Sequence, residues 1–346
     1  MISAALARRF TPGGFPARTL LTYSALGLWS VVCLLPLYWV AVTTLKQPLD
    51  IISGARYLPW IDFKPTLDAW RFILFDPTDD TRGRFVNSVI VAVTSTGLTI
   101  FFGSLAAYGV RRFPVRLSPI LAGIAGIIIL AVLGLPLLGR GATLGLVAAA
   151  VLVIIATRRW GPRGGKARWS VGNSGLLVAI LASRILPPVV TVLPIYYAVA
   201  NLGLLDTRTT LVAVYTAVNM PIAIWLLIGF FDEIPVEVEE AAQLDGASRF
   251  RTFISIVVPM TKAGIFATVL LVFVFCWNEY LFSLYLTTDH ALTMPPFLAG
   301  QMATREQMAS ADPEWGYFTV LIVLMVAPLA VFTGLLQRVV TRTSAR

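Results

Sequence analysis

The sequence contains few charged residues, one histidine and two cysteines. Asp, Glu, Lys and Arg make up 13% of its 346 residues, well below the roughly 25% that is typical of soluble domains. A single histidine, His290, cannot form a metal site, and Cys33 and Cys276 lie within apolar runs where they cannot build a disulfide framework. No Ser/His/Asp set or cysteine cluster is present. The sequence therefore predicts no catalytic residue and no cofactor bound by the chain itself.

Long hydrophobic runs take the place of charge. Hydrophobic residues make up 57% of the chain, and the mean hydropathy is +0.80, so an integral membrane protein is predicted. A helix needs about 20 apolar residues to cross about 30 Å of hydrocarbon, and backbone groups in lipid have to be paired within it. We therefore predict an all-α protein with about eight membrane-spanning helices. The expected spans are residues 20–43, 86–109, 118–138, 142–157, 176–200, 210–230, 263–286 and 317–337.

Lys and Arg are distributed unevenly between the two sides of these spans. If residues 1–19 are cytoplasmic, the segments on that side carry three to five Lys or Arg each, whereas short segments on the other side carry one each. Because cytoplasmic loops are enriched in these residues, both ends, 1–19 and 338–346, are predicted to be cytoplasmic. Residues 44–85 then form an external loop, with a short amphipathic helix near 66–75. The net charge of +9 reflects this topology and does not imply nucleic-acid binding.

A polar, acidic segment, residues 232–262, interrupts the apolar sequence. Pro235 can open a helix, and the acidic residues after it suit the positive end of the helix dipole. Asp245 and Gly246 predict a turn, because glycine adopts positive φ angles without steric cost. A second helix is expected after this turn, until Pro259 disrupts it. The pattern predicts a cytoplasmic helix–turn–helix that a partner protein can grip, although an ordinary acidic loop has the same composition.

A motif within this segment resembles the EAA signature of permease subunits of ATP-binding-cassette importers. It reads Glu240-Ala241-Ala242, three residues, Gly246, nine residues, Ile256, one residue, Val258-Pro259. Leucine is usual at the position of Val258. Other motifs resemble the carbohydrate branch of that family, which is of the maltose-permease type (MalG-like). They are Asn87-Ser88, Ala106-Ala107-Tyr108, Arg112-Phe113, Leu186-Pro187-Pro188, residues 202–207, residues 277–282 and Thr293-Met294-Pro295.

The resemblance implies a type I importer permease with the MetI-like fold, in the bacterial inner membrane. Residues 86–337 would form the permease domain, which pairs with a second homologous permease around a central path, and a heterodimer is favoured. Two ATP-hydrolysing subunits would bind ATP and Mg²⁺, and an extracytoplasmic sugar-binding protein would deliver the sugar. The chain itself would be a non-catalytic subunit.

The resemblance also assigns the acidic segment as the part that couples the permease to the ATPase. Glu240 would pair with a basic group or cap backbone on the ATPase, Gly246 would set the elbow, and Arg249 would face an acidic rim. The two alanines of the motif would allow a close contact. The implied coupling residues are Glu240, Ala241, Ala242, Asp245, Gly246, Ala247, Arg249 and Pro259.

Residues 114–172 have no counterpart in the usual six-span subunit. They contain the two extra spans, at 118–157, followed by a basic linker. A hairpin that leaves and returns to the cytoplasm would preserve the topology downstream. A peripheral hairpin that adds packing area, a docking site for a partner or lipid, and a re-entrant pair are all consistent with this sequence.

A polar group lies inside the seventh apolar run. A charge at the membrane centre costs roughly 2.5–3.5 kcal/mol on insertion scales, so Glu279 is expected to face protein or water. Amides, carboxylates and aromatic faces also suit sugar hydroxyls. The candidates for the substrate path are Trp277, Asn278, Glu279, Tyr280 and Asn219. An ion pair between Glu279 and Arg184, or helix packing alone, would explain the same residues.

A secondary transporter driven by an ion gradient is the alternative function. Such folds show inverted repeats and intramembrane acids, but Glu279 is the one acidic residue in the expected spans, and no repeat is evident. The glycine-rich run at 161–167 lacks the first glycine and the Ser or Thr of a phosphate-binding loop. The sequence therefore shows no ATPase of its own, which favours a permease that relies on a partner.

Overall fold

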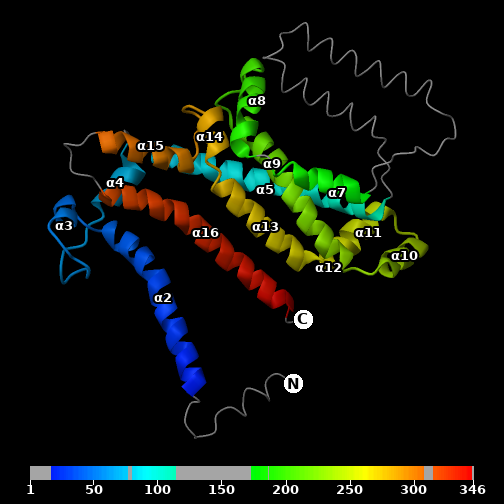
Figure 1. Ribbon diagram of the computed structural model, residues 1–346, viewed down its shortest axis with the longest axis horizontal. Coiled ribbons are helices and arrows are strands. Elements are labelled where there is room, and N and C mark those ends of the chain that lie inside the picture. Colours follow the sequence, from blue (N-terminus) through cyan, green and yellow to red (C-terminus); the bar gives the residue numbers. More distant parts are fainter. Residues whose placement is uncertain (1–16, 77–79, 114–172, 186, 308–314, 345–346) are drawn as a thin grey trace. The chain divides into compact units, whose positions relative to one another are not determined.

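The computed structural model describes residues 17–76, 80–113, 173–185, 187–307 and 315–344. Across these residues the regular structure is helical, and the only β-type pairing is an isolated bridge between Pro59 and Phe63 (Figure 1). The chain divides into two compact units, residues 1–79 with 310–323 and residues 80–309 with 324–346. The all-α class expected from the sequence is confirmed.

The first unit contains an apolar helix and a small cluster of shorter elements. Its elements are α2 (Ala17–Thr43), α3 (Pro48–Ile52), α4 (Asp68–Phe75) and the start of α16 (Trp315–Ser344). The expected short helix near 66–75 is confirmed as α4, which buries Ala69 and Ile73. Lys46, just after α2, places its ammonium group 4.3 Å from the centre of the Trp39 ring. This cation–π contact ties the loop to the end of α2.

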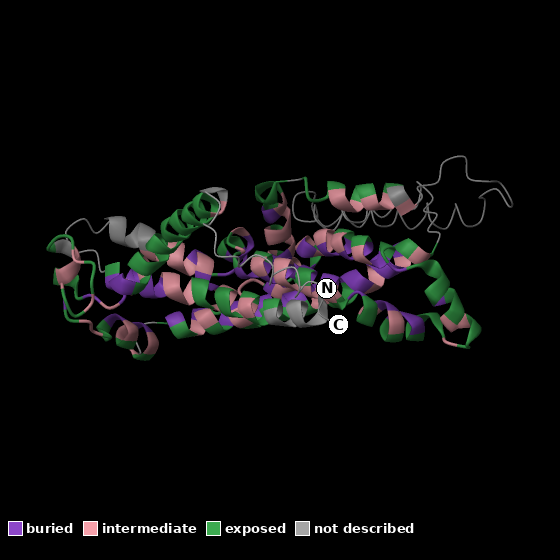
Figure 2. Cartoon of the chain, turned by 90° about the horizontal axis from the view of Figure 1, so that it is seen from below, coloured by how far each residue is buried: buried purple, intermediate pink, exposed green. Residues whose placement is uncertain are grey.

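The second unit is built around three helices that pack along one another, namely α5 (Thr81–Arg112), α9 (Arg208–Asp232) and α13 (Lys262–Trp277). Small side chains let α5 and α9 approach closely, because a Cβ added at Gly103 would lie 3.4 Å from Ala223. The Ser95 hydroxyl donates to the Val212 carbonyl across this contact. Buried residues recur along the packed helices, while exposed residues take their other faces (Figure 2).

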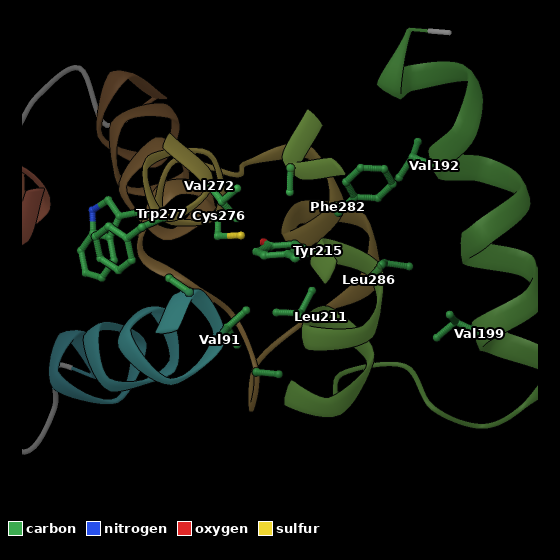
Figure 3. Close-up of a cluster of buried hydrophobic side chains, with 14 residues drawn as sticks. Val91, Val192, Val199, Leu211, Tyr215, Val272, Cys276, Trp277, Phe282 and Leu286 are labelled. Carbon is green, nitrogen blue, oxygen red and sulfur yellow. The ribbon is translucent and has the colours of Figure 1, made fainter. Parts of the chain in front are cut away.

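Helices α7 (Asn173–Ala182), α8 (Pro188–Asn201), α14 (Leu281–Leu286) and α15 (Met294–Gln307) also belong to this unit, as does the later part of α16. Its main apolar core includes Leu211 and Tyr215 of α9, Val272 of α13 and Phe282 of α14 (Figure 3). A second cluster of buried side chains lies at the C-terminal ends of α5 and α9. The acidic segment, residues 232–262, contributes Phe253 and Val257 to this second cluster.

Two expected spans are interrupted. Four helices of the described residues are long and apolar enough to cross a membrane, and one bent pair could form a fifth span. Residues 176–200 form two helices, α7 and α8, instead of one. Pro187 and Pro188 interrupt the span, because a proline has no N–H to donate to a continuous helix and disfavours the helical conformation in the residue before it. Residues 263–286 form α13 and α14, separated at 278–280. The expected spans 118–138 and 142–157 lie outside the described residues.

The acidic segment forms a helix, a turn and a second helical stretch, as expected. It comprises α10 (Val236–Leu244), α11 (Arg249–Thr252), the π-helix η1 (Phe253–Val257) and α12 (Val258–Met260). The sequence predicted that Pro259 would disrupt the second helix, but Pro259 lies inside α12. The wider turn of the preceding π-helix accommodates a residue that has no N–H to donate. The break follows at Thr261, where α13 starts at 81° to this stretch.

Candidate coupling site and transport path

The turn after α10 is a Schellman motif. The Ala247 N–H donates to the Ala242 carbonyl over 3.0 Å, and the Gly246 N–H donates to the Gln243 carbonyl over 3.0 Å, the two bonds that define this helix end. Gly246 has a φ of +86°, which favours glycine. Ser248 then caps α11 by accepting from the Arg251 N–H. The local sequence therefore builds a defined elbow rather than a loose loop.

Most residues that the resemblance assigned to coupling lie at the surface of the second unit. Glu240, Ala241, Asp245, Gly246, Arg249 and Pro259 are exposed, whereas Ala242 and Ala247 are partly buried. Leu244, at the end of α10, is 89% exposed. The Arg249 guanidinium group lies 4.9 Å from the centre of the Phe113 ring. The elbow thus presents small, acidic and apolar groups together to solvent.

The residue before the predicted Glu240 is buried and holds α10 in place. Glu239 is 3% exposed. Its carboxylate accepts from Arg112 Nε over 2.7 Å and from the Tyr108 hydroxyl over 2.9 Å. Arg112 also donates to the carbonyls of Phe231 and Ile234, where α9 ends. Removing one partner of a buried ion pair typically costs about 3–5 kcal/mol, so this contact fixes the corner between α5, α9 and α10.

Sequence reasoning missed this contact. Glu239 was counted only as a negative charge near a helix start, although Tyr108 and Arg112 carried a usable signal. Their spacing of four residues puts both side chains on one face at the end of an apolar helix. Polar groups at such a position need a hydrogen-bonding or charged partner from another segment. The partner itself comes from a segment more than a hundred residues away, which no local pattern identifies.

Aromatic rings form the layer beneath this polar contact. The Tyr108 and Phe253 rings lie 4.8 Å apart, and Phe253 meets Phe231 edge-on with centroids 6.1 Å apart. Phe253 belongs to η1, the far arm of the elbow, and is buried. Both arms of the acidic segment therefore contact the same end of α5.

The candidate path residues divide between the core and the surface. Trp277 is buried and its indole N–H donates to the Met325 carbonyl over 2.9 Å. Asn219 is also buried and donates to the Tyr215 carbonyl and to Cys276 Sγ. Figure 3 shows Tyr215 and Cys276 pointing toward each other in this core. Trp277 and Asn219 therefore contribute to helix packing in the second unit.

The remaining candidates lie at the break between α13 and α14. Asn278 is exposed and donates back to the Val274 carbonyl, and Tyr280 is 41% exposed. Glu279 accepts from the Phe282 N–H over 3.2 Å, so its carboxylate caps the start of α14. No ion pair within 4 Å joins Glu279 to Arg184 in the described structure, and the Arg184 guanidinium group lies 5.5 Å from the centre of the Phe275 ring.

A polar network at the opposite end of α5 was also missed by the sequence. Asp206, which follows α8, accepts hydrogen bonds from the backbone N–H groups of residues 288–291 and from the Thr288 hydroxyl. Burial raises the pKa of Asp206, but the hydrogen bonds from Ala291, His290 and Thr288 outweigh it and lower the pKa to about 2. This carboxylate therefore organises the loop after α14.

The same loop is bound to the start of α5. Arg84 pairs with Asp289, and the Asn87 amide donates to the carbonyls of His290 and Leu292 over 2.8 and 3.0 Å. The His290 side chain is exposed. Helix α5 is thus held at both ends by residues distant in sequence.

The comparisons with known proteins agree with this arrangement. The family described as "Binding-protein-dependent transport system inner membrane component" matches residues 166–345. The trehalose/maltose transport system permease protein MalG of Thermococcus litoralis is 27% identical, covering 93% of this chain and 92% of the relative. The diacetylchitobiose uptake system permease protein NgcG of Streptomyces coelicolor is 26% identical, covering 92% of this chain and 84% of the relative. These matches give no support to an ion-gradient carrier.

Solved structures share the fold. One chain of a bacterial ABC transporter involved in the import of the acidic polysaccharide alginate superposes with a TM-score of 0.58 at 16% identity, covering 95% of this chain and 99% of that chain. A chain of the alginate transporter in complex with a pentasaccharide-bound periplasmic protein gives a TM-score of 0.50 at 12% identity, covering 94% of this chain and 96% of that chain. At these identities the likeness establishes the helical architecture.

Proposed function

We propose that this chain, which belongs to the family of binding-protein-dependent transport system inner membrane components, is the permease subunit of an ATP-driven carbohydrate importer. It forms half of the translocation path and is not itself catalytic. ATP and Mg²⁺ are bound by partner ATPase subunits. The observation that carries this proposal is the exposed elbow at Gly246, which a bilayer-spanning segment does not need and which an ATPase can grip.

The elbow couples ATP hydrolysis to movement of the helices. When two ATPase subunits close on ATP, they push the exposed face of α10, with Glu240 facing a basic group or backbone of the ATPase. The low profile of Ala241 lets the partner approach, and Gly246 sets the direction of the following arm. Arg249 lies beside this face and meets an acidic rim. The exposure of these groups supports the assignment.

The substrate class is a disaccharide or a short oligosaccharide. Two relatives of similar length are named for trehalose, maltose or diacetylchitobiose, and a third, SugB of Mycobacterium tuberculosis, for trehalose at 25% identity, covering 88% of each chain. Asn278 and Tyr280, exposed beside the helix break, are the path residues best placed to meet a sugar, because an amide and an aromatic face suit its hydroxyls and ring.

The assembly contains a second homologous permease, two ATPase subunits and an extracytoplasmic sugar-binding protein. The two permeases are different chains. Both termini and the elbow face the cytoplasm, while the loop organised by Asp206 faces outward. The basic residues of the cytoplasmic segments support this orientation.

Purification of the chain from its native membrane tests this function. The copurifying proteins would be identified by mass spectrometry, and ATP hydrolysis would be measured with and without the binding protein and a panel of disaccharides. We expect a second permease, an ATPase and a binding protein, with hydrolysis stimulated by one sugar class. Recovery of the chain alone, without ATPase activity, would contradict the proposal.

A further inference from the structure

Helix α10 has one buried side chain, and that side chain contacts α5. All residues of α10 are described, and Glu239 is the one that is buried. Its carboxylate oxygens are held by Arg112 and Tyr108 of α5. Glu239 is therefore the most direct side-chain link through which a displacement of the exposed face of α10 acts on α5.

Tyr108 contacts both arms of the elbow. Its hydroxyl donates to Glu239 of α10, and its ring lies 4.8 Å from that of Phe253 in η1. Tyr108 thus makes a polar contact with one arm of the elbow and an apolar contact with the other. A π-helix such as η1 often marks a functional position, and here it orients Phe253 toward α5.

Helix α5 can carry this displacement a long way. It runs unbroken from Thr81 to Arg112, a length of about 48 Å at 1.5 Å per residue. Its other end is bound to the loop after α14 through Arg84 and Asn87. Arg112 also holds the end of α9, so α5 and α9 would respond together at the elbow.

We propose that Tyr108, Arg112 and Glu239 act as positioning residues that transmit movement of α10 to α5 and α9. This inference rests on the proposed function, since the movement comes from the ATPase. Hydrogen bonds with fixed donors and acceptors hold one register, whereas an apolar contact would allow α10 to slide. The triad keeps the elbow and α5 moving as one body.

The test uses the complete complex in proteoliposomes, with a disaccharide that the unaltered complex transports. Uptake and ATP hydrolysis are measured together, and their ratio is the readout, because a merely structural defect lowers the yield of complex without changing that ratio. Glu239→Gln removes the charge and keeps the shape. Tyr108→Phe removes the hydroxyl and keeps the ring against Phe253. Glu233→Gln, an exposed acid between α9 and α10, is the matched control.

We expect uptake per ATP hydrolysed to fall about tenfold in Glu239→Gln and by a smaller factor in Tyr108→Phe. The double variant should be no worse than Glu239→Gln, because both act through one contact. An unchanged ratio in both assembled variants, or an equal fall in Glu233→Gln, would overturn the proposal. If Glu239→Gln does not assemble, Tyr108→Phe decides. No ATP-driven uptake by the unaltered complex would overturn the proposed function, and this inference with it.

Discussion

Gly246 lies in open space with its backbone in the left-handed region. Its φ is +86°, and a Cβ added there would meet nothing within 4 Å. The cost of a side chain at this position is therefore a backbone cost alone. Strain of about 1–2 kcal/mol is expected for most residues, but asparagine tolerates this conformation well.

Replacing Gly246 with valine should uncouple transport from ATP hydrolysis. A strain of about 1.4 kcal/mol would lower the equilibrium constant for the elbow conformation about tenfold, so we expect uptake per ATP hydrolysed by the assembled complex to fall by up to this factor while membrane insertion is retained. Gly246→Asn is the matched control and should stay near the unaltered rate. Equal uptake by the two variants, measured in proteoliposomes, would show that the elbow angle does not matter.

Asp206 should make stability depend on acidic pH. Its pKa falls from 3.8 to about 2 on folding, so its stabilising contribution is complete above about pH 4 and is lost as the pH falls toward 2. We expect Asp206→Asn to lower the unfolding free energy by about 1–3 kcal/mol near neutral pH, with the difference narrowing below pH 4. Thermal unfolding of the purified protein between pH 7 and pH 3 measures this.

The control for Asp206→Asn is Glu233→Gln, which removes an exposed acid at the other end of the unit. Its unfolding temperature should follow that of the unaltered protein at every pH. A constant difference between Asp206→Asn and the unaltered protein down to pH 3 would mean that the carboxylate is not the group responsible.

At the scale of single residues, the sequence identified the exposed groups better than the buried ones. Gly246 and the turn around it followed from local chemistry, because a glycine after an acidic helix predicts a positive φ. Glu239 and Asp206 did not, because each is defined by partners far along the chain. The sequence alone does not distinguish a carboxylate that faces solvent from one that accepts several hydrogen bonds.

Two neighbouring helices, α9 and α13, meet without room for a methyl group. A Cβ added at Gly264 would lie 2.2 Å from the Phe230 ring, whereas one added at Gly229 of the same pair of helices would meet nothing within 4 Å. The start of α13 can therefore approach α9 only through a glycine. This close approach lies directly after the 81° bend.

Gly264→Ala should destabilise the second unit. Overpacking of this kind typically costs about 1–3 kcal/mol, and the Phe230 ring has to move for the methyl group to fit. Adding Phe230→Leu should recover most of the loss, and Gly229→Ala alone should be close to neutral. Thermal unfolding of Gly264→Ala, Phe230→Leu, the double variant and Gly229→Ala, each compared with the unaltered protein, measures this. No recovery in the double variant would place the conflict elsewhere.

At the scale of elements, hydropathy located the long helices and overlooked their breaks. Residues 86–109 and 210–230 were expected spans and lie within α5 and α9. The breaks after α7 and α13 were not predicted, since an average over apolar residues ignores where a backbone N–H is missing or a side chain caps a new helix. Pro187, which lacks an N–H, and Glu279, which caps α14, were the residues in the sequence that indicated these breaks.

At the scale of the whole molecule, the proposed orientation predicts which residues are accessible from each side of the membrane. Leu244 and His290 are both exposed, and the proposed orientation puts them on opposite sides. In a Cys33→Ser background, an impermeant maleimide should label His290→Cys in intact cells and Leu244→Cys only after permeabilisation. Cys276 is buried and should stay unlabelled. Labelling of Leu244→Cys from outside would reverse the assigned topology.

The wider architecture was predictable because the chain belongs to a family whose motifs are widely spaced along it. The EAA run predicted a turn at Gly246, and the structure has that turn between α10 and α11. The role of residues 114–172 was left open by the sequence, and these residues lie outside the described part of the chain. Their two flanks, however, are described.

Those flanks meet. The Asn173 amide donates to the carbonyls of Val110 and Phe113, so the chain re-enters the described fold at the point where it left. In evolutionary terms, such a junction is a site at which a segment can be inserted or deleted. Because Asn173 already joins the two flanks, we expect them to stay in contact whatever length of sequence lies between Phe113 and Asn173. A single genetic event that adds or removes a whole module here would therefore leave the helices of the described fold in place.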